Sequence, residues 1–227
     1  MAALNRTQIA WRTAQDIEDG MIVNLGMGLP VLAADFVPPG RDVFIHAENG
    51  VIGCGPLAAP EAADTDLVDA GSRRITLRPG AAIVDSTASF AMIRGGHIDV
   101  TVLGAFQVAA NGDLANWDMR LADKGPLVGG AMDLAACARA VWVIMEHVTR
   151  KGDPRLLQAC TLPLTAVGCV RRVFTDLAVI DVAGTGFLVR EMVEGLSRDD
   201  LQAATGAKLN FAADCRALSV PALTEAA

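Results

Sequence analysis

The chain has 227 residues, of which 52% are hydrophobic and only 4% aromatic, and its formal net charge is −7. This length is enough for one large domain with a full core, and no stretch reaches the roughly 18 apolar residues that span a bilayer. The acidic balance and the lack of a basic face argue against a nucleic-acid partner. Residues 1–11 lack the features of a signal peptide and the five cysteines form no C-x-x-C pair, so we expect a cytoplasmic protein with reduced thiols.

Segments typical of helices and strands alternate along the chain. A capping pattern at Asn5 predicts a first helix, which Gly20 ends. Further helices are expected at 30–36, 86–94, 131–139 and 201–205. Strands are expected at 21–25, 42–47, 75–77, 82–84, 98–104 and 141–145, with three more between 169 and 189. The alternation predicts an α/β fold with an open, mixed, mostly parallel sheet covered by helices, in one domain over 1–210 with a C-terminal tail at 211–227.

The segment 44–53 is an apolar, β-branched run that stops at Glu48 and continues at once with Asn49 and Gly50. A carboxylate between a strand and a tight turn points out of the fold at a fixed place, where it can be a general base, a metal ligand or a nucleophile. Taken alone, the segment is better explained by a simple Asn-Gly hairpin with a solvated glutamate. The three histidines have no ligand spacing and the cysteines of a zinc deaminase are missing downstream of His46, so we expect no metal.

Two glycine-rich loops are the other candidates for a site. The segment 26–30, Gly-Met-Gly-Leu-Pro, matches neither the dinucleotide fingerprint nor the phosphate-binding P-loop, and fits a plain strand-to-helix turn as well as a ligand-facing loop. Gly129 and Gly130 precede a helix-forming segment, where open backbone N–H groups can approach a ligand or a developing oxyanion. Without other evidence, an ordinary loop before a helix is the simpler explanation of this pair.

Nine segments of the chain form a specific series when they are read in order. They are residues 23–30, 48–56, 92–99, 102–108, 112–117, 129–134, 145–147, 160–165 and 175–179. Seen together, they closely resemble the B subunit of the class I CoA-transferases, the family that includes the 3-oxoacid and 3-oxoadipate CoA-transferases. The resemblance extends from about residue 4 to about residue 209 and implies the fold shared by CoA-transferases and sugar-phosphate isomerases.

The resemblance also implies roles for individual residues. The nucleophile of the family falls on Glu48, and Gly129 and Gly130 fall near the oxyanion site. The implied substrate-binding positions are Asn24, Gly26, Gly28, Asn49 and Gly50. The family usually has serine before the glutamate, whereas this chain has Ala47, so a hydroxyl that could hold the carboxylate is missing.

The implied activity is transfer of CoA from succinyl-CoA to 3-oxoadipate or a related 3-oxo acid, through a covalent glutamyl-CoA thioester and with ping-pong kinetics. The CoA thioester is a substrate, and no metal or other cofactor is implied. The family places its site between A and B subunits, which implies an A-subunit partner, an assembly of two A and two B chains, and little activity of this chain alone.

Two alternatives remain open at this stage. Segments 103–107 and 126–130 are more similar to 3-oxoadipate enzymes than to ketone-body enzymes, but an acetoacetate- or acetate-type CoA-transferase stays an alternative. An alternative of another class is a non-catalytic CoA or sugar-phosphate binding protein of the same fold. Such a protein does not need a carboxylate at position 48, so its ligand binding tolerates Glu48→Gln, whereas CoA transfer does not.

Overall fold

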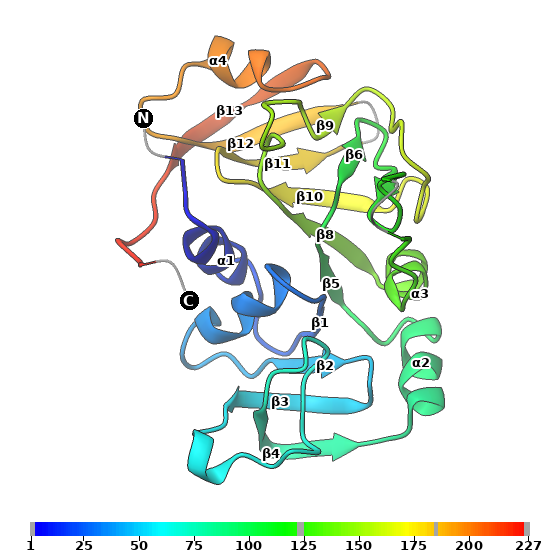
Figure 1. Ribbon diagram of the computed structural model, residues 1–227. Helices are drawn as coiled ribbons and strands as arrows, with labels where there is room; N and C mark the ends of the chain where they lie inside the picture. The colour runs from blue at the N-terminus through cyan, green and yellow to red at the C-terminus, as the bar shows by residue number, and fades with distance from the viewer. Residues whose placement is uncertain (1–2, 122–124, 184–185, 225–227) are drawn as a thin grey trace.

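The computed structural model describes residues 3–121, 125–183 and 186–224. Its main sheet contains β1 (Ile22–Leu25), β2 (Phe44–Ala47), β3 (Val51–Leu57), β4 (Ile75–Ile83), β5 (Val100–Leu103), β8 (Ala140–Ile144), β10 (Val170–Phe174), β11 (Ala178–Val182), β12 (Phe187–Val193) and β13 (Leu209–Leu218). These ten strands follow the order β13-β12-β11-β10-β8-β5-β1-β2-β3-β4 (Figure 1). A small sheet joins β7 (Leu114–Ala115), β6 (Gln107–Ala109) and β9 (Leu156–Leu157).

The centre of the main sheet is parallel and its flanks are antiparallel. Strands β2, β1, β5, β8 and β10 run parallel, whereas β3 and β4 on one side and β11 and β12 on the other add antiparallel pairs. The last strand, β13, is parallel to β12. All four residues of β5 are buried, as expected for a parallel strand that is covered on both faces. The predicted mixed, mostly parallel sheet is confirmed.

Helices cover both faces of the sheet. They are α1 (Arg6–Ala14), α2 (Ser86–Arg94), α3 (Ala131–Cys137) and α4 (Arg198–Ala203), with short 3-10 segments η1 (Pro30–Phe36) and η2 (Pro60–Ala62). In Figure 1, α1 and η1 lie on one side of the central strands, and α2 and α3 on the other. Successive residues of β8 enter the two cores alternately, because Val143 packs in the cluster that contains α2 and α3 residues and Ile144 in the cluster that contains α1 residues.

Two local predictions are wrong in detail. The strands expected at 75–77 and 82–84 are one strand, β4, because β4 is the outer strand of the sheet and tolerates Pro79 there. Gly80 adopts a φ of +83°, which lets the strand bend without being interrupted. The segment 30–36 forms the 3-10 segment η1 and not an α-helix.

The boundary expected at residue 210 between domain and tail falls inside β13. This strand pairs with β12 from Leu209 to Leu218. Because it contains several alanines, its sequence shows no clear alternation of large apolar and polar residues. The residues that follow β13 return to the start of α1, where the side chains of Asn5 and Gln8 donate hydrogen bonds to the carbonyl oxygens of Leu223 and Pro221. Among the residues described, no helix is long and apolar enough to cross a membrane.

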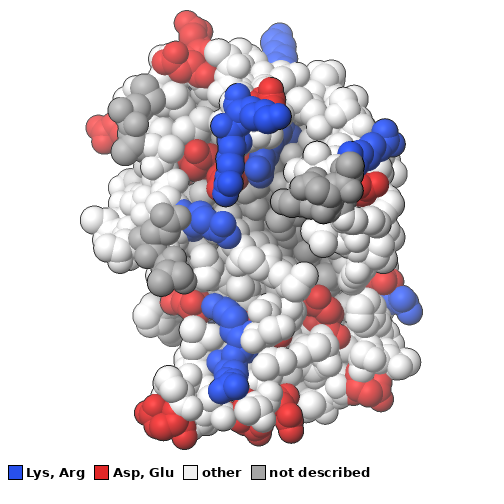
Figure 2. Space-filling view, in the orientation of Figure 1, with Lys and Arg blue, Asp and Glu red and all other residues white. Residues whose placement is uncertain are grey.

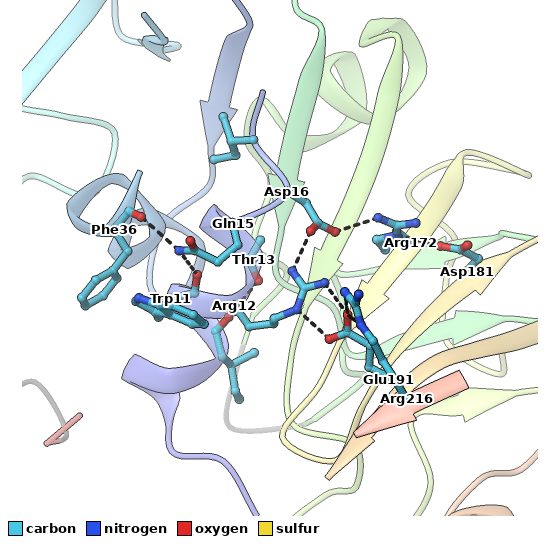
Figure 3. Close-up of polar contacts among 12 residues, drawn as sticks. Trp11, Arg12, Thr13, Gln15, Asp16, Phe36, Arg172, Asp181, Glu191 and Arg216 are labelled. Atoms are coloured by element: carbon cyan, nitrogen blue, oxygen red, sulfur yellow. Dashed lines mark hydrogen bonds and ion pairs between the residues drawn. The ribbon is translucent and has the colours of Figure 1, made fainter. Parts of the chain in front are cut away.

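Acidic and basic side chains are interspersed on the face shown in Figure 2. A cluster of ion pairs ties α1 to the sheet (Figure 3). Glu191 of β12 is 4% exposed, accepts hydrogen bonds from Arg12 at 2.7 and 2.9 Å, and accepts another from Arg216 at 2.5 Å. Asp16 links Arg12 to Arg172 of β10. Burial alone would raise the pKa of Glu191, but the hydrogen bonds and positive charges of Arg12 and Arg216 outweigh burial and lower it.

The Glu191→Gln variant is expected to lose about 2 kcal/mol of unfolding free energy at about pH 7, because Arg12 and Arg216 lose the negative charge that they share. The loss stays moderate because Asp16 still pairs with Arg12 and one acceptor remains at position 191. Since the pKa of Glu191 is lower in the folded protein, its stabilisation is present above the ordinary value of 4.5 and disappears as the pH falls through the folded value. The difference between variant and native protein should therefore shrink in acid. Urea unfolding at about pH 7 and about pH 3 measures it.

Glu146→Gln is the matched control for this prediction. The Glu146 side chain is 47% exposed and lies 3.6 Å from Arg155, so its loss should change the unfolding free energy by less than about 0.5 kcal/mol. A Glu191→Gln difference that stays the same in acid would contradict the assignment of the effect to the ionised carboxylate.

Candidate active site

Glu48 lies in the tight turn between β2 and β3. The N–H of Gly50 donates to the carbonyl oxygen of Ala47 at 3.0 Å, and the carbonyl oxygen of Gly50 accepts from the N–H of Val84 at 2.9 Å. Gly50 has a φ of +121°, and a Cβ atom there would lie 2.0 Å from the carbonyl oxygen of Val84. Only glycine fits this position, and the turn holds the half-buried Glu48 at the carboxyl end of β2.

Three buried polar side chains lie beneath the turn, on adjacent parallel strands. Asn24 of β1 is paired with His46 of β2 on one side and with Thr101 of β5 on the other. The amide Nδ2 of Asn24 lies 3.4 Å from Glu48 Oε2 and 3.2 Å from both Nδ1 and the carbonyl oxygen of His46. Thr101 Oγ1 donates to Asn24 Oδ1 at 3.2 Å, and His46 Nε2 lies 3.0 Å from the hydroxyl of Ser89 in α2. Burial lowers the pKa of His46 to about 4, so its imidazole is neutral at pH 7.

Gly130, the residue that precedes α3, lies close to the side chain of Glu48. A Cβ atom at Gly130 would lie 3.5 Å from Glu48 Cγ and 3.1 Å from Cζ of Phe90. The absence of a side chain therefore lets this backbone come close to the Glu48 side chain. Gly129 is exposed, and a Cβ atom there would meet no other atom within 4 Å. The fold thus brings together the segments 48–50 and 129–130, which lie far apart in the sequence.

The remaining candidate positions lie beside this centre. Gly26 follows β1, its N–H donates to the carbonyl oxygen of Val102 at 2.9 Å, and a Cβ atom would lie 3.3 Å from that same oxygen. Gly28 is exposed in the same loop with a φ of +81°. Asn49 donates its side-chain N–H to the carbonyl oxygen of Val68 at 2.9 Å, so its amide anchors the turn that carries Glu48.

The family model described as coenzyme A transferase matches residues 6–204 of this chain. The chain belongs to the coenzyme A transferase family. It is 51% identical over 206 residues to the B subunit of the 3-oxoadipate CoA-transferase of Acinetobacter baylyi, and the match covers 91% of this chain and 95% of that one. The predicted likeness to the B subunit of a class I CoA-transferase is confirmed.

Two further similar proteins are longer, and this chain spans less than half of each. It is 46% identical over 203 residues to the mitochondrial succinyl-CoA:3-ketoacid coenzyme A transferase 2 of Homo sapiens, and the match covers 88% of this chain but only 39% of the human protein. The crystal structure of an acyl-CoA transferase apoenzyme from Escherichia coli O157:H7 superposes with a TM-score of 0.74 at 18% identity, over 96% of this chain and 44% of that chain. The latter likeness confirms the CoA-transferase fold.

The sequence did not reveal that Asn24, His46, Thr101 and Ser89 form a buried polar layer beneath the turn that carries Glu48. In the sequence, His46 suggested only a metal ligand, and nothing marked Ser89 or Thr101. A signal is nevertheless present, because one polar residue interrupts each of the short, otherwise apolar strands β1, β2 and β5. Ala47, where the family usually has serine, is 2% exposed and packs in an apolar cluster with Val51 and Ile75.

Proposed function

We propose that this chain is the B subunit of an enzyme that transfers CoA from succinyl-CoA to 3-oxoadipate, with Glu48 as its covalent nucleophile. The observation that carries the proposal is the setting of Glu48. Glu48 is half-buried on a turn that only glycine permits, its carboxylate faces the amide of Asn24, and its side chain lies against the backbone of Gly130. The 51% identity to the B subunit of a 3-oxoadipate CoA-transferase supports the choice of 3-oxoadipate.

The proposed reaction begins when one carboxylate oxygen of Glu48 attacks the thioester carbonyl carbon of succinyl-CoA. The tetrahedral intermediate collapses, the CoA thiolate leaves, and a succinyl-glutamyl anhydride remains. The thiolate then attacks the Glu48 carbonyl carbon and releases succinate, which leaves a glutamyl-CoA thioester. A 3-oxoadipate carboxylate attacks this thioester, and the same two steps in reverse release 3-oxoadipyl-CoA and restore Glu48. The kinetics are ping-pong, and the thioester itself supplies the activation without a further cofactor.

Each step of this sequence passes through a negatively charged tetrahedral oxygen. Backbone N–H groups of Gly129 and Gly130 are suited to stabilise this charge, because no side chain blocks their approach. We assign Asn24 and the loop of Gly26 and Gly28 to substrate contacts at the same edge of the sheet. Asn49 and Gly50 contribute through the turn that they hold, as their hydrogen bonds to Val68 and Val84 indicate.

We further propose that an A subunit completes the site. This chain covers only 39% of the human relative, so in that protein the matching segment is joined to a further one. Large apolar side chains are exposed on the segments around the site: Met27 at 69%, Ile83 at 65%, Leu127 at 67% and Val128 at 73%. Exposed apolar groups of this kind are typical of a surface that another chain covers. The proposed assembly contains two A and two B subunits.

The test of this function is a transfer assay on the purified A–B complex and on each of the two chains by itself. With succinyl-CoA as donor and 3-oxoadipate as acceptor, the complex should form 3-oxoadipyl-CoA and the B chain alone should form almost none. Turnover numbers in the range of roughly 1–10³ per second are usual for enzymes. Substantial turnover by the B chain alone would contradict the dependence on A.

The acceptor is resolved by comparing kcat/KM for 3-oxoadipate, acetoacetate and acetate in the same assay. If kcat/KM is highest for 3-oxoadipate, the proposal is supported. If it is highest for acetoacetate, the enzyme is instead a CoA-transferase of the ketone-body type. Binding of CoA esters without transfer to any acceptor would support the non-catalytic alternative.

A further inference from the structure

Four buried polar side chains lie beneath Glu48, although apolar side chains could fill the same space. Asn24, His46 and Thr101 are 0%, 1% and 0% exposed, and Ser89 behind them is also 0% exposed. Buried polar groups are costly unless each finds a partner. Among the described residues these four form a continuous chain of hydrogen bonds that ends at the carboxylate of Glu48.

The contacts of Asn24 determine which way its amide group points. One end of the amide faces the carbonyl oxygen of His46 at 3.2 Å and the carboxylate oxygen of Glu48 at 3.4 Å. A backbone carbonyl oxygen and a carboxylate oxygen both accept hydrogen bonds, so the atom that faces them must be the nitrogen, Nδ2. The opposite end, Oδ1, then accepts the hydroxyl hydrogen of Thr101 at 3.2 Å.

The orientation of the Asn24 amide in turn determines the tautomer of His46. Nδ1 of His46 lies 3.2 Å from Asn24 Nδ2, whose two hydrogens are shared among this nitrogen, the His46 carbonyl oxygen and Glu48 Oε2. A hydrogen on Nδ1 would face a second donor, so Nδ1 must carry none. The ring hydrogen of the neutral imidazole therefore resides on Nε2 and is donated to the hydroxyl oxygen of Ser89 at 3.0 Å. The low pKa of His46, about 4, keeps the ring neutral and able to accept at Nδ1.

We propose that Thr101 and His46 are positioning residues that lock the Asn24 amide with its N–H directed at Glu48. The inference rests on the proposed role of Glu48 as the nucleophile. A reversed amide would place its oxygen against the carboxylate, where two negatively polarised oxygens repel each other. The locked N–H holds one oxygen of Glu48, leaves the other for attack, and faces the oxygen on which charge develops when the Glu48 carbonyl is itself attacked.

The first test compares two substitutions of Thr101 in the A–B complex. Thr101→Val keeps the shape but removes the hydroxyl, and should lower kcat about tenfold while KM for succinyl-CoA changes less than about twofold. Thr101→Ser keeps the hydroxyl and should restore kcat to within about threefold of the native value. Native kcat in Thr101→Val, or equal losses in both variants, would overturn the proposal.

Thr13→Val is the matched control for these substitutions. Thr13 is 0% exposed and donates its hydroxyl hydrogen to the carbonyl oxygen of Ile9 within α1. It therefore reports the cost of losing one buried threonine hydroxyl away from the site, and kcat should stay native. A loss of kcat in Thr13→Val equal to that in Thr101→Val would overturn the proposal by assigning the effect to general destabilisation.

The second test does not depend on activity or on a variant that folds. The imidazole nitrogens of His46 in the native complex give distinct ¹⁵N signals for protonated and unprotonated atoms. We expect Nε2 to carry the hydrogen and Nδ1 to be bare at pH values down to about 5, since the pKa is about 4. Hydrogen on Nδ1 would overturn the proposal even if Glu48 is the nucleophile. Conversely, failure of Glu48 to react would overturn the proposed function without changing this tautomer.

Discussion

Glu48→Gln is expected to lower the rate of CoA transfer by at least about a thousandfold, because the amide oxygen of glutamine is a very weak nucleophile. The substitution keeps the volume of the side chain and leaves an oxygen that can still accept the Asn24 hydrogen bond. The turn and its surroundings should therefore remain intact, so that the loss reflects chemistry and not folding. Stopped-flow or steady-state assays of the A–B complex with succinyl-CoA and 3-oxoadipate measure the loss.

Glu194→Gln serves as the control for Glu48→Gln. Glu194 is an exposed glutamate that follows β12, and its loss should leave kcat within about twofold of the native value. Binding of CoA esters to the Glu48→Gln complex, measured by calorimetry, should be retained. A Glu48→Gln complex that transfers CoA within tenfold of the native rate would remove Glu48 from the reaction.

Gly50→Ala is expected to have the second large effect and to destabilise the protein by about 4 kcal/mol, near the upper end of single substitutions. The added Cβ atom would lie 2.0 Å from the carbonyl oxygen of Val84, and the φ of +121° is unfavourable for any residue with a side chain. Relief of this clash requires the turn to separate from the end of β4, which moves Glu48. We therefore expect both a lower urea midpoint and a loss of CoA transfer.

Gly40→Ala is the matched control for the glycine substitution. Gly40 also has a positive φ, of +86°, but a Cβ atom there would meet nothing within 4 Å. Its replacement should cost only about 1 kcal/mol of backbone strain and leave transfer unchanged. Equal destabilisation by the two substitutions would show that the contact with Val84 is not the cause.

The fold was largely predictable because its strands carry strong local signals. The β-branched runs at β5 and β8 lie in the parallel centre of the sheet, and β11 lies beside this centre. Strands that are buried on both faces are recognisable in a sequence as continuous apolar segments. The edge strands were less predictable. Pro79 looked like a break although β4 tolerates it, and the alanine-rich β13 showed no clear alternation.

The centre of the site was predictable only through its motif. Glu48 and Gly130 are separated by 81 intervening residues, and no local pattern reveals that Gly130 lies against the Glu48 side chain. No local sequence pattern reveals the polar layer either, because Asn24, His46 and Thr101 become neighbours only through the pairing of their strands. One polar residue in each of three buried strands becomes informative once the strand order is known.

Peptide mass mapping of the native A–B complex after mixing with succinyl-CoA tests the role of Glu48 most directly. Borohydride treatment traps a glutamyl thioester by reducing it, so the product is stable to digestion. We expect the modification on the peptide that contains Glu48, in an amount that matches the active sites present, and none in the Glu48→Gln complex. An unmodified Glu48 peptide from a complex that is transferring CoA would contradict covalent catalysis by this residue.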